Sequence, residues 1–135
     1  MAKADQNPSE SIAPMLSVRR GAEAVAFYKN AFGAEELFKI EDERGRVVAQ
    51  LSIGRAVFWL ADESPDNANF SPEHLGGGSV RMIFTVPDPD AIVKQAIAAG
   101  AKEIWPVGNR NGWRLGRVLD PFGHHWEIGK PNSLK

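Results

Sequence analysis

The spacing of apolar residues divides the chain into two consecutive series of strands and helices. Runs in which apolar and polar residues alternate predict strands, and runs with apolar residues three and four positions apart predict helices. The first series contains, in order, a strand at 11–18, a helix at 22–32 and strands at 37–41, 46–53 and 56–61. The second contains a strand at 80–86, a helix at 89–99 and strands at 102–107, 115–119 and 124–128. Both series therefore have the order β-α-β-β-β.

The two series also resemble each other in sequence around the end of each helix. A shift of 67 residues aligns Gly33 with Gly100 and gives five identities over the fourteen positions 24–37. Asp88 followed by Pro89 is typical of a helix start, and a glycine is typical of the position after a helix. Because helix-stop chemistry alone favours a shared glycine, the common order of elements is the stronger evidence for an internal duplication.

Residues 63–78 separate the two series and contain two prolines, two asparagines and three consecutive glycines. This composition predicts a structureless linker. The organisation that we expect is a flexible tail, two modules and the linker between them, with the modules forming one domain over 11–130. In chain order these parts are the tail at 1–10, the first module at 11–62, the linker at 63–78 and the second module at 79–130.

Each predicted helix can cover only one face of the sheet in its module, so we expect the opposite faces to enclose a cleft. Strand alternation assigns the larger apolar side chains to the helix side. These are Leu16, Val18, Phe58, Leu60, Met82, Phe84, Trp126 and Ile128. Their neighbours are assigned to the cleft side, namely Ala13, Met15, Ser17, Val48, Gln50, Val57, Trp59, Arg81, Ile83, Thr85, His125 and Glu127. Residues 114–118 are partly apolar on both faces, so alternation does not orient them.

The last two strands form the stretch with the most reactive side chains. They are joined by residues 120–123, which have proline and glycine at the second and fourth positions of a type I turn. Charged or titratable side chains in and beside this hairpin are Arg114, Arg117, His124, His125 and Glu127. We expect the hairpin to form one wall of the site and residues 109–112 to form a mobile loop that gates it.

Composition and charge exclude several classes of function. Sixteen basic and seventeen acidic residues give a net charge of −1, which favours neither nucleic acid nor anionic lipid as a partner. No apolar run is long enough to cross a membrane, and the first residues lack the apolar region of a signal peptide. Cysteine is absent, which excludes disulfides and thiolate chemistry. We therefore expect a cytoplasmic protein with a small-molecule partner.

The expected duplication, together with the sequences at 26–34, 120–124 and 126–128, carries a resemblance to a known family. On these features the chain resembles the vicinal oxygen chelate superfamily. That group contains glyoxalases, bleomycin-resistance proteins and extradiol dioxygenases, and the PhnB-like branch is the part of it that this sequence resembles. The resemblance covers about 11–130. It implies an α+β fold of two tandem βαβββ modules whose curved mixed sheets enclose a cleft. It says little about function, because one fold hosts many chemistries.

Metal-dependent members of this superfamily place metal ligands on the first and last strand of each module. Those positions correspond here to Ala13, Trp59, Arg81 and Glu127. Only Glu127 is able to bind a metal, and Arg81 places a fixed cation where a divalent ion would lie. The resemblance therefore implies a site without its usual metal. An ion pair between Arg81 and Glu127 across the cleft is the interpretation that we prefer for these two residues.

The candidate site residues follow from these assignments. Glu127, as a general base, and His125, as a proton donor, are the candidate catalytic residues. Gln50, Trp59, Arg81, Trp105, Trp113 and Arg114 are the candidate ligand-binding residues. Arg114 and Arg117 suit either an anionic ligand group or a solvated surface. His124 is expected to end the turn and to satisfy backbone groups there.

Three functions remain open at this stage. The first is a bleomycin-resistance type of protein that binds a small aromatic or amphipathic molecule in a metal-free cleft, with no cofactor. The second is a lyase, isomerase or dioxygenase that uses Glu127 with a divalent metal on a rearranged ligand set. The third is a degenerate structural dimer whose cleft is collapsed around Trp59. In each case we expect a homodimer, because open sheet faces and edges favour pairing.

Overall fold

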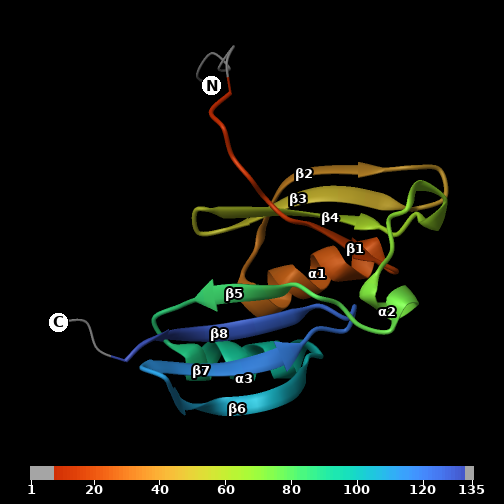
Figure 1. Ribbon diagram of the computed structural model, residues 1–135. Coiled ribbons are helices and arrows are strands. Elements are labelled where there is room, and N and C mark those ends of the chain that lie inside the picture. Colours follow the sequence, from red (N-terminus) through yellow and green to blue (C-terminus); the bar gives the residue numbers. More distant parts are fainter. Residues whose placement is uncertain (1–7, 133–135) are drawn as a thin grey trace.

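The computed structural model describes residues 8–132 and contains two βαβββ modules (Figure 1). The first consists of β1 (Met15–Val18), α1 (Gly21–Phe32), β2 (Glu35–Glu41), β3 (Val47–Ile53) and β4 (Ala56–Asp62). The second consists of β5 (Arg81–Thr85), α3 (Pro89–Ala99), β6 (Lys102–Arg110), β7 (Trp113–Leu119) and β8 (His125–Pro131). The predicted fold class and order of elements are confirmed.

Each module folds its strands into one mixed, four-stranded sheet. The strand order is β1-β4-β3-β2 in the first sheet and β5-β8-β7-β6 in the second. The first strand of each module pairs in parallel with the last, and the other pairs are antiparallel. The parallel pair forms because the helix that follows the first strand carries the chain across the sheet.

The two modules share one hydrophobic core, which lies between the helices and the helix-facing sides of the sheets. The ring of Phe32 in α1 lies 4.7 Å from the ring of Trp126 and 5.2 Å from that of Phe84, both in the second module. Most of the predicted helix-facing residues are buried, and Met82 and Phe84 pack against this core while remaining partly exposed. Strand alternation therefore assigned the core side of both sheets correctly.

A buried carboxylate also joins the modules. Asp120, in the turn before β8, is 2% exposed and accepts a hydrogen bond from the Tyr28 hydroxyl in α1. The same oxygen accepts one from the Trp126 indole at 2.9 Å, and the other oxygen accepts the backbone N–H groups of Phe122 and His124. Burial, and next the charge of Asp120, hold the pKa of Tyr28 well above its usual value, so its hydroxyl stays protonated.

Three local predictions need correction. β1 begins at Met15 rather than at residue 11, because Pro14 has no N–H for the ladder and Ile12 is fully exposed. The first half of the predicted mobile loop at 109–112 belongs to β6, and the second half, Asn111-Gly112 at φ 51° and 84°, forms a tight turn between β6 and β7. The predicted structureless linker contains η1 (Pro65–Asn67) and α2 (Pro72–Leu75).

Residues 1–7 of the predicted tail lie outside the described residues, and residues 8–10 are exposed without regular structure. None of the helices within residues 8–132 has the length and apolar character needed to cross a membrane.

Candidate functional site

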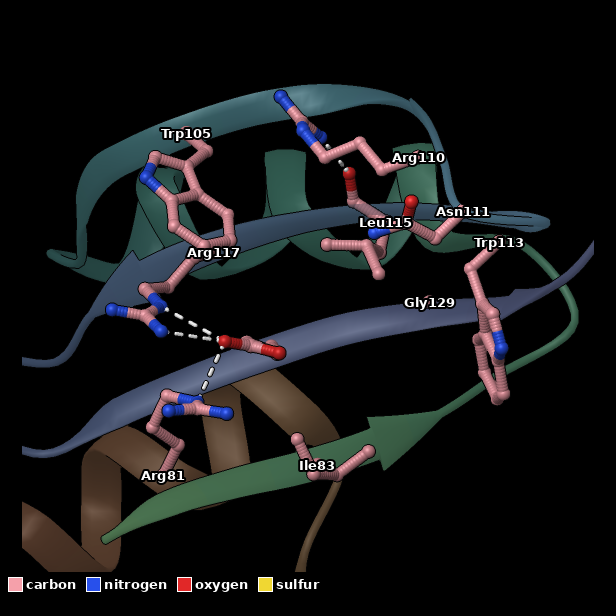
Figure 2. A pocket seen from close by; sticks show the side chains of 10 residues that line it. Arg81, Ile83, Trp105, Arg110, Asn111, Trp113, Leu115, Arg117 and Gly129 are labelled. Atoms are coloured by element: carbon pink, nitrogen blue, oxygen red, sulfur yellow. Dashed lines mark hydrogen bonds and ion pairs between the residues drawn. The ribbon is translucent and has the colours of Figure 1, made fainter. Parts of the chain in front are cut away.

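A pocket of about 500 Å³ lies on the face of the second sheet that no helix of its module covers (Figure 2). All four strands of that sheet contribute to it. The lining residues are Arg81, Ile83, Trp105, Arg110, Asn111, Trp113, Leu115, Arg117, Glu127 and Gly129. Its volume falls within the range of roughly 300 to 1,000 Å³ that is usual for small-molecule sites.

Strand pairing brings the central residues of the pocket into one row across the sheet. Ile83 of β5 pairs with Glu127 of β8, Glu127 pairs with Arg117 of β7, and Arg117 pairs with Trp105 of β6. Directly paired residues project their side chains to the same face. Four residues that are up to 44 positions apart in the sequence therefore form a continuous surface.

Glu127 is held by two arginines. Its Oε2 lies 2.8 Å from Nε of Arg81 and accepts hydrogen bonds from Nη2 of Arg117 at 2.6 Å and from its Nε at 3.2 Å (Figure 2). The side chains of Glu127 and Arg117 are only 14% and 16% exposed, whereas that of Arg81 is 55% exposed. The predicted ion pair between Arg81 and Glu127 is present, but it joins the neighbouring strands β5 and β8 of one sheet rather than crossing a cleft. Arg117 is the more buried of the two arginine partners.

Arginine also packs against the aromatic wall of the pocket. The Arg117 guanidinium lies 4.4 Å from the centre of the Trp105 ring, and that of Arg110 lies 5.6 Å from it. Both distances are within the range of cation–π attraction. Arg110 also donates from Nη1 to the backbone oxygen of Leu115 at 2.6 Å. Two guanidinium groups thus lie within cation–π range of Trp105.

Four of the predicted site residues meet in this pocket: Arg81, Glu127, Trp105 and Trp113. Gln50 and Trp59 do not line it. They lie on the first sheet, where Gln50 pairs with Trp59 and with Phe38. The ring of Phe38 lies 6.0 Å from that of Trp59, edge to face. Their row occupies the same position in the first sheet that Glu127 and Arg117 occupy in the second.

Arg114 lies outside the pocket, on the helix side of β7. Its Nε and Nη2 each donate to the carboxylate of Asp90 at 2.7 Å, near the start of α3. These hydrogen bonds raise the pKa of Arg114 and lower that of Asp90. Arg114 therefore supports the packing of β7 on α3. The structure does not place it where it would contact a ligand in the pocket.

The two adjacent histidines point to different surroundings. Nε2 of His124 lies 2.9 Å from the backbone oxygen of Ser17, which only accepts, so Nε2 donates. The His124 side chain therefore satisfies a backbone group, but that group lies on β1 of the first module and not in the turn, where it was expected. His125 lies beside the pocket rather than in its lining. Its Nδ1 is buried and has no partner among the described residues, and burial, followed by the charge of Arg117, lowers the pKa of His125.

Sequence reasoning missed Arg110 and Asn111 and left Arg117 without a definite role. The signal for Arg117 was its alternation with Trp113 and Leu115, which places the three on one face of β7. Arg110 had no such signal. β6 contains register irregularities between Glu103 and Trp105 and between Trp105 and Gly108, so period-two counting fails along it.

The residues at the superfamily's usual ligand positions do not fit a divalent metal. Ala13 lies before β1, and neither its side chain nor that of Trp59 has an atom that coordinates a metal. Arg81 and Arg117 place two positive charges beside the one remaining carboxylate. Within residues 8–132, no three His, Cys, Asp or Glu side chains are grouped so as to hold a metal ion.

Comparisons with known proteins agree with this fold. A family model described as Glyoxalase/Bleomycin resistance protein/Dioxygenase superfamily matches residues 12–128. An uncharacterized protein of Mycobacterium bovis is 36% identical over 130 residues, covering 93% of this chain and 86% of that protein. The X-ray structure of a gene product of Arabidopsis thaliana has a TM-score of 0.71 at 28% identity, covering 91% of this chain and all of that one.

The same architecture occurs in more distant structures. The fosfomycin resistance protein FosX of Listeria monocytogenes has a TM-score of 0.71 at 17% identity, covering 93% of this chain and 95% of that chain. At this level of identity the similarity concerns the fold alone.

Proposed function

The chain belongs to the Glyoxalase/Bleomycin resistance protein/Dioxygenase superfamily, and on that premise we propose that it binds a small aromatic or amphipathic molecule without using a metal. The binding site in this proposal is the pocket of the second sheet. Trp105, Trp113, Ile83 and Leu115 form its apolar walls, and its polar groups are concentrated on a few charged side chains. Apolar walls with a few polar groups are typical of small-molecule sites.

The observation that carries the proposal is the environment of Glu127. Its Oε2 lies 2.8 Å from the guanidinium group of Arg81 and 2.6 Å from that of Arg117, and it partly neutralises their positive charge. A divalent ion at Glu127 would have to approach two fixed positive charges within contact distance and would gain only one carboxylate ligand. Arginine stays protonated at any ordinary pH, so this repulsion does not relax.

The first sheet supports a further part of the proposal, which is a homodimer. Its uncovered face presents exposed apolar side chains, among them Met15, Phe38, Ile40 and Val48, beside Trp59. A contiguous apolar surface of this kind favours burial against a second surface. We propose that a second copy of the chain covers it. Sedimentation velocity tests this: Phe38→Glu should shift the protein from dimer to monomer, and a monomeric wild type would contradict the proposal.

Metal dependence is the competing function, and metal content tests it directly. We expect inductively coupled plasma mass spectrometry to find no stoichiometric nickel, zinc or manganese in the purified protein. Its melting temperature should stay unchanged when these ions are added. A bound ion, or a rise in melting temperature as binding linkage predicts, would favour a metal-dependent lyase, isomerase or dioxygenase instead. Glu127→Gln is the control, because it would remove such a rise only if the ion binds at Glu127.

A further inference from the structure

We infer that the ligand of this pocket is an amphipathic anion, bound with its acidic group at Arg81 and Arg117 and its ring system against Trp113. This inference rests on the proposed function and specifies the chemical class and the orientation of the ligand. Three features of the pocket lead to it: its polarity along the strands, the free donors of its arginines and its flat apolar floor.

The pocket changes from charged to apolar along three neighbouring strands in the same direction. On β5 Arg81 is followed by Ile83, and on β8 Glu127 is followed by Gly129. On β7, which runs antiparallel, Arg117 is followed in the same spatial direction by Leu115 and then Trp113. Figure 2 shows Arg81 and Arg117 at one end of the pocket and Trp113 at the other.

The strand rise gives the length of a matching ligand. Residues two apart on a strand are separated by roughly 7 Å, and residues four apart by roughly 13 Å. Leu115 and its paired residue Gly129 therefore lie about 7 Å from the row of Glu127 and Arg117, and Trp113 about 13 Å from it. Ile83 pairs with Glu127 and forms the apolar wall beside the charged row. A ring system of one or two fused rings that carries an acidic group spans this distance.

The charged end has donors to offer and a net positive charge. Glu127 engages Nε of Arg81 and Nε and Nη2 of Arg117. No hydrogen bond within residues 8–132 uses the two Nη atoms of Arg81 or Nη1 of Arg117. Two guanidinium groups against one carboxylate leave one positive charge at this end. Arg110, whose backbone pairs with Trp113, adds a further positive charge nearer the other end of the pocket. A planar acid such as a carboxylate is the group that a guanidinium fork binds best, and an amine would be repelled.

The apolar end is flat because of Gly129. A Cβ atom at this position would lie 2.6 Å from Cβ of Leu115 and 2.7 Å from the backbone oxygen of Arg114, so β8 and β7 pair here only with glycine. The missing side chain leaves the floor open between Ile83 and Trp113 (Figure 2). An aromatic ring lying on this floor contacts Leu115 and reaches the indole of Trp113.

Three probes of the same shape test the inference. They are naphthalene-2-carboxylate, its isosteric carboxamide and 2-naphthylmethylammonium, with affinity measured by isothermal titration calorimetry. We expect the carboxylate to bind at least ~10-fold more tightly than the carboxamide, because only the carboxylate forms charge-assisted hydrogen bonds with the arginines. The ammonium compound should bind most weakly. Arg81→Gln should lower carboxylate affinity ~10-fold and leave carboxamide affinity unchanged, and the remote Arg55→Gln should change neither.

The indole N–H signals of the four tryptophans locate the probes by NMR. Binding in the inferred orientation should shift the signals of Trp113 and Trp105 and leave those of Trp59 and Trp126 in place. Equal affinity for the three probes, with the Trp113 signal shifted, would overturn the anion inference but keep the proposed binding function. Binding that shifts only Trp59 would overturn both, as would no binding of any probe at millimolar concentration.

Discussion

The two modules of this protein present the same positions of the same fold with different chemistry. Across the open face of the first sheet, paired strands align Met15, Trp59, Gln50 and Phe38. Across the second sheet, the equivalent row is Ile83, Glu127, Arg117 and Trp105. The two rows are related by shifts of 67 and 68 residues. One row is uncharged, and the other holds the partly buried ion pair of Arg117 and Glu127.

This difference indicates which copy carries the site. Both modules have a sheet face that no helix covers, but only the second face combines guanidinium groups, a carboxylate and tryptophans around the pocket described above. The first face has the exposed apolar character of a surface that another surface covers. Where a fold is repeated, the positions at which the copies diverge in charge therefore point to the functional face more directly than the shared positions do.

The largest expected effect on stability concerns the turn that joins the last two strands of each module, because this turn also differs between the modules. Asp120→Ala removes a buried carboxylate that accepts four hydrogen bonds, including one from Tyr28 of the other module. We expect a loss of about 3 kcal/mol in the free energy of unfolding, because several buried donors lose their partner. Urea unfolding followed by tryptophan fluorescence measures this loss.

The first module offers a matched control for that substitution. Its equivalent turn is Gly54-Arg55, and Arg55→Ala at this exposed position should change stability by less than about 0.5 kcal/mol. Tyr28→Phe separates the inter-module hydrogen bond from the rest of the Asp120 network. If Asp120→Ala and Arg55→Ala had equal effects, the two turns would be interchangeable and the comparison between modules would fail.

Much of the fold was predictable because the signals that define it are local. The α+β class, the order of elements and the helix-facing side of each sheet follow from apolar periodicity and from turn residues such as Pro121 and Gly123. The contact between Arg81 and Glu127 was predictable because strand alternation assigns both side chains to the face that the helix does not cover. Their position on the neighbouring strands β5 and β8 was not predicted. Alternation therefore assigned the helix-facing side of the regular strands correctly, but it did not show which of the other side chains meet in one site.

The rest of the site depends on features that sequence periodicity does not encode. Bulges in β6 change which side chains face the pocket, so Arg110 was missed. Arg114 was assigned to the ligand because its partner, Asp90, lies 24 positions away at the start of α3. Gln50 and Trp59 were grouped with Glu127 because alternation gives the face of each sheet but not the relative position of the two sheets.

Ligand binding tests the division of roles between the modules. Trp113→Ala should weaken binding of naphthalene-2-carboxylate ~10-fold, because the ring loses apolar contact area at the far end of the pocket. Trp59→Ala, the matched change on the first sheet, should leave the affinity unchanged. Calorimetric titration of both variants measures this. A comparable loss in Trp59→Ala would show that the first sheet also contacts the ligand and would break the comparison.

A smaller effect is expected in the segment that follows the first module. Ser71 is fully buried, and its hydroxyl donates a hydrogen bond to the carboxylate of Glu63 at 2.7 Å. This hydrogen bond is the largest of the causes that lower the pKa of Glu63 to about 2. Ser71→Ala should cost about 1 kcal/mol at neutral pH. Ser64→Ala, which loses only a surface contact with Asn67, is the control.

The pH dependence of this contact has a defined sign. Because the folded pKa of Glu63 lies below the unfolded value of 4.5, the contact stabilises the protein fully above pH 4.5. The stabilisation is lost as the pH falls from 4.5 towards 2. The difference in stability between wild type and Ser71→Ala should therefore shrink on acidification, and an NMR titration of Glu63 should show its pKa raised in the variant. A Glu63 pKa unchanged by the substitution would contradict the assignment.

The smallest expected effect concerns His125, whose counterpart in the first module is Val57. His125 pairs with Arg81 in the sheet, lies near Arg117, His124 and Asp120, and has a buried, unpartnered Nδ1. Burial, and next Arg117, keep the folded pKa of His125 below the ordinary value of 6.5. The unfolded chain therefore takes up a proton first, and stability is lost as the pH falls through 6.5 towards the folded pKa.

His125→Val makes this position of the second module like the first. The variant should lack that acid-induced loss, so urea unfolding at about pH 7.5 and about pH 5.5 should show a smaller decrease in stability than in wild type. At the higher pH the two proteins should be similar, since the neutral imidazole contributes an unpartnered buried atom rather than a contact. Parallel profiles for both proteins would mean that His125 titrates in the folded state as it does in the unfolded chain. The module difference at this position would then have no electrostatic consequence.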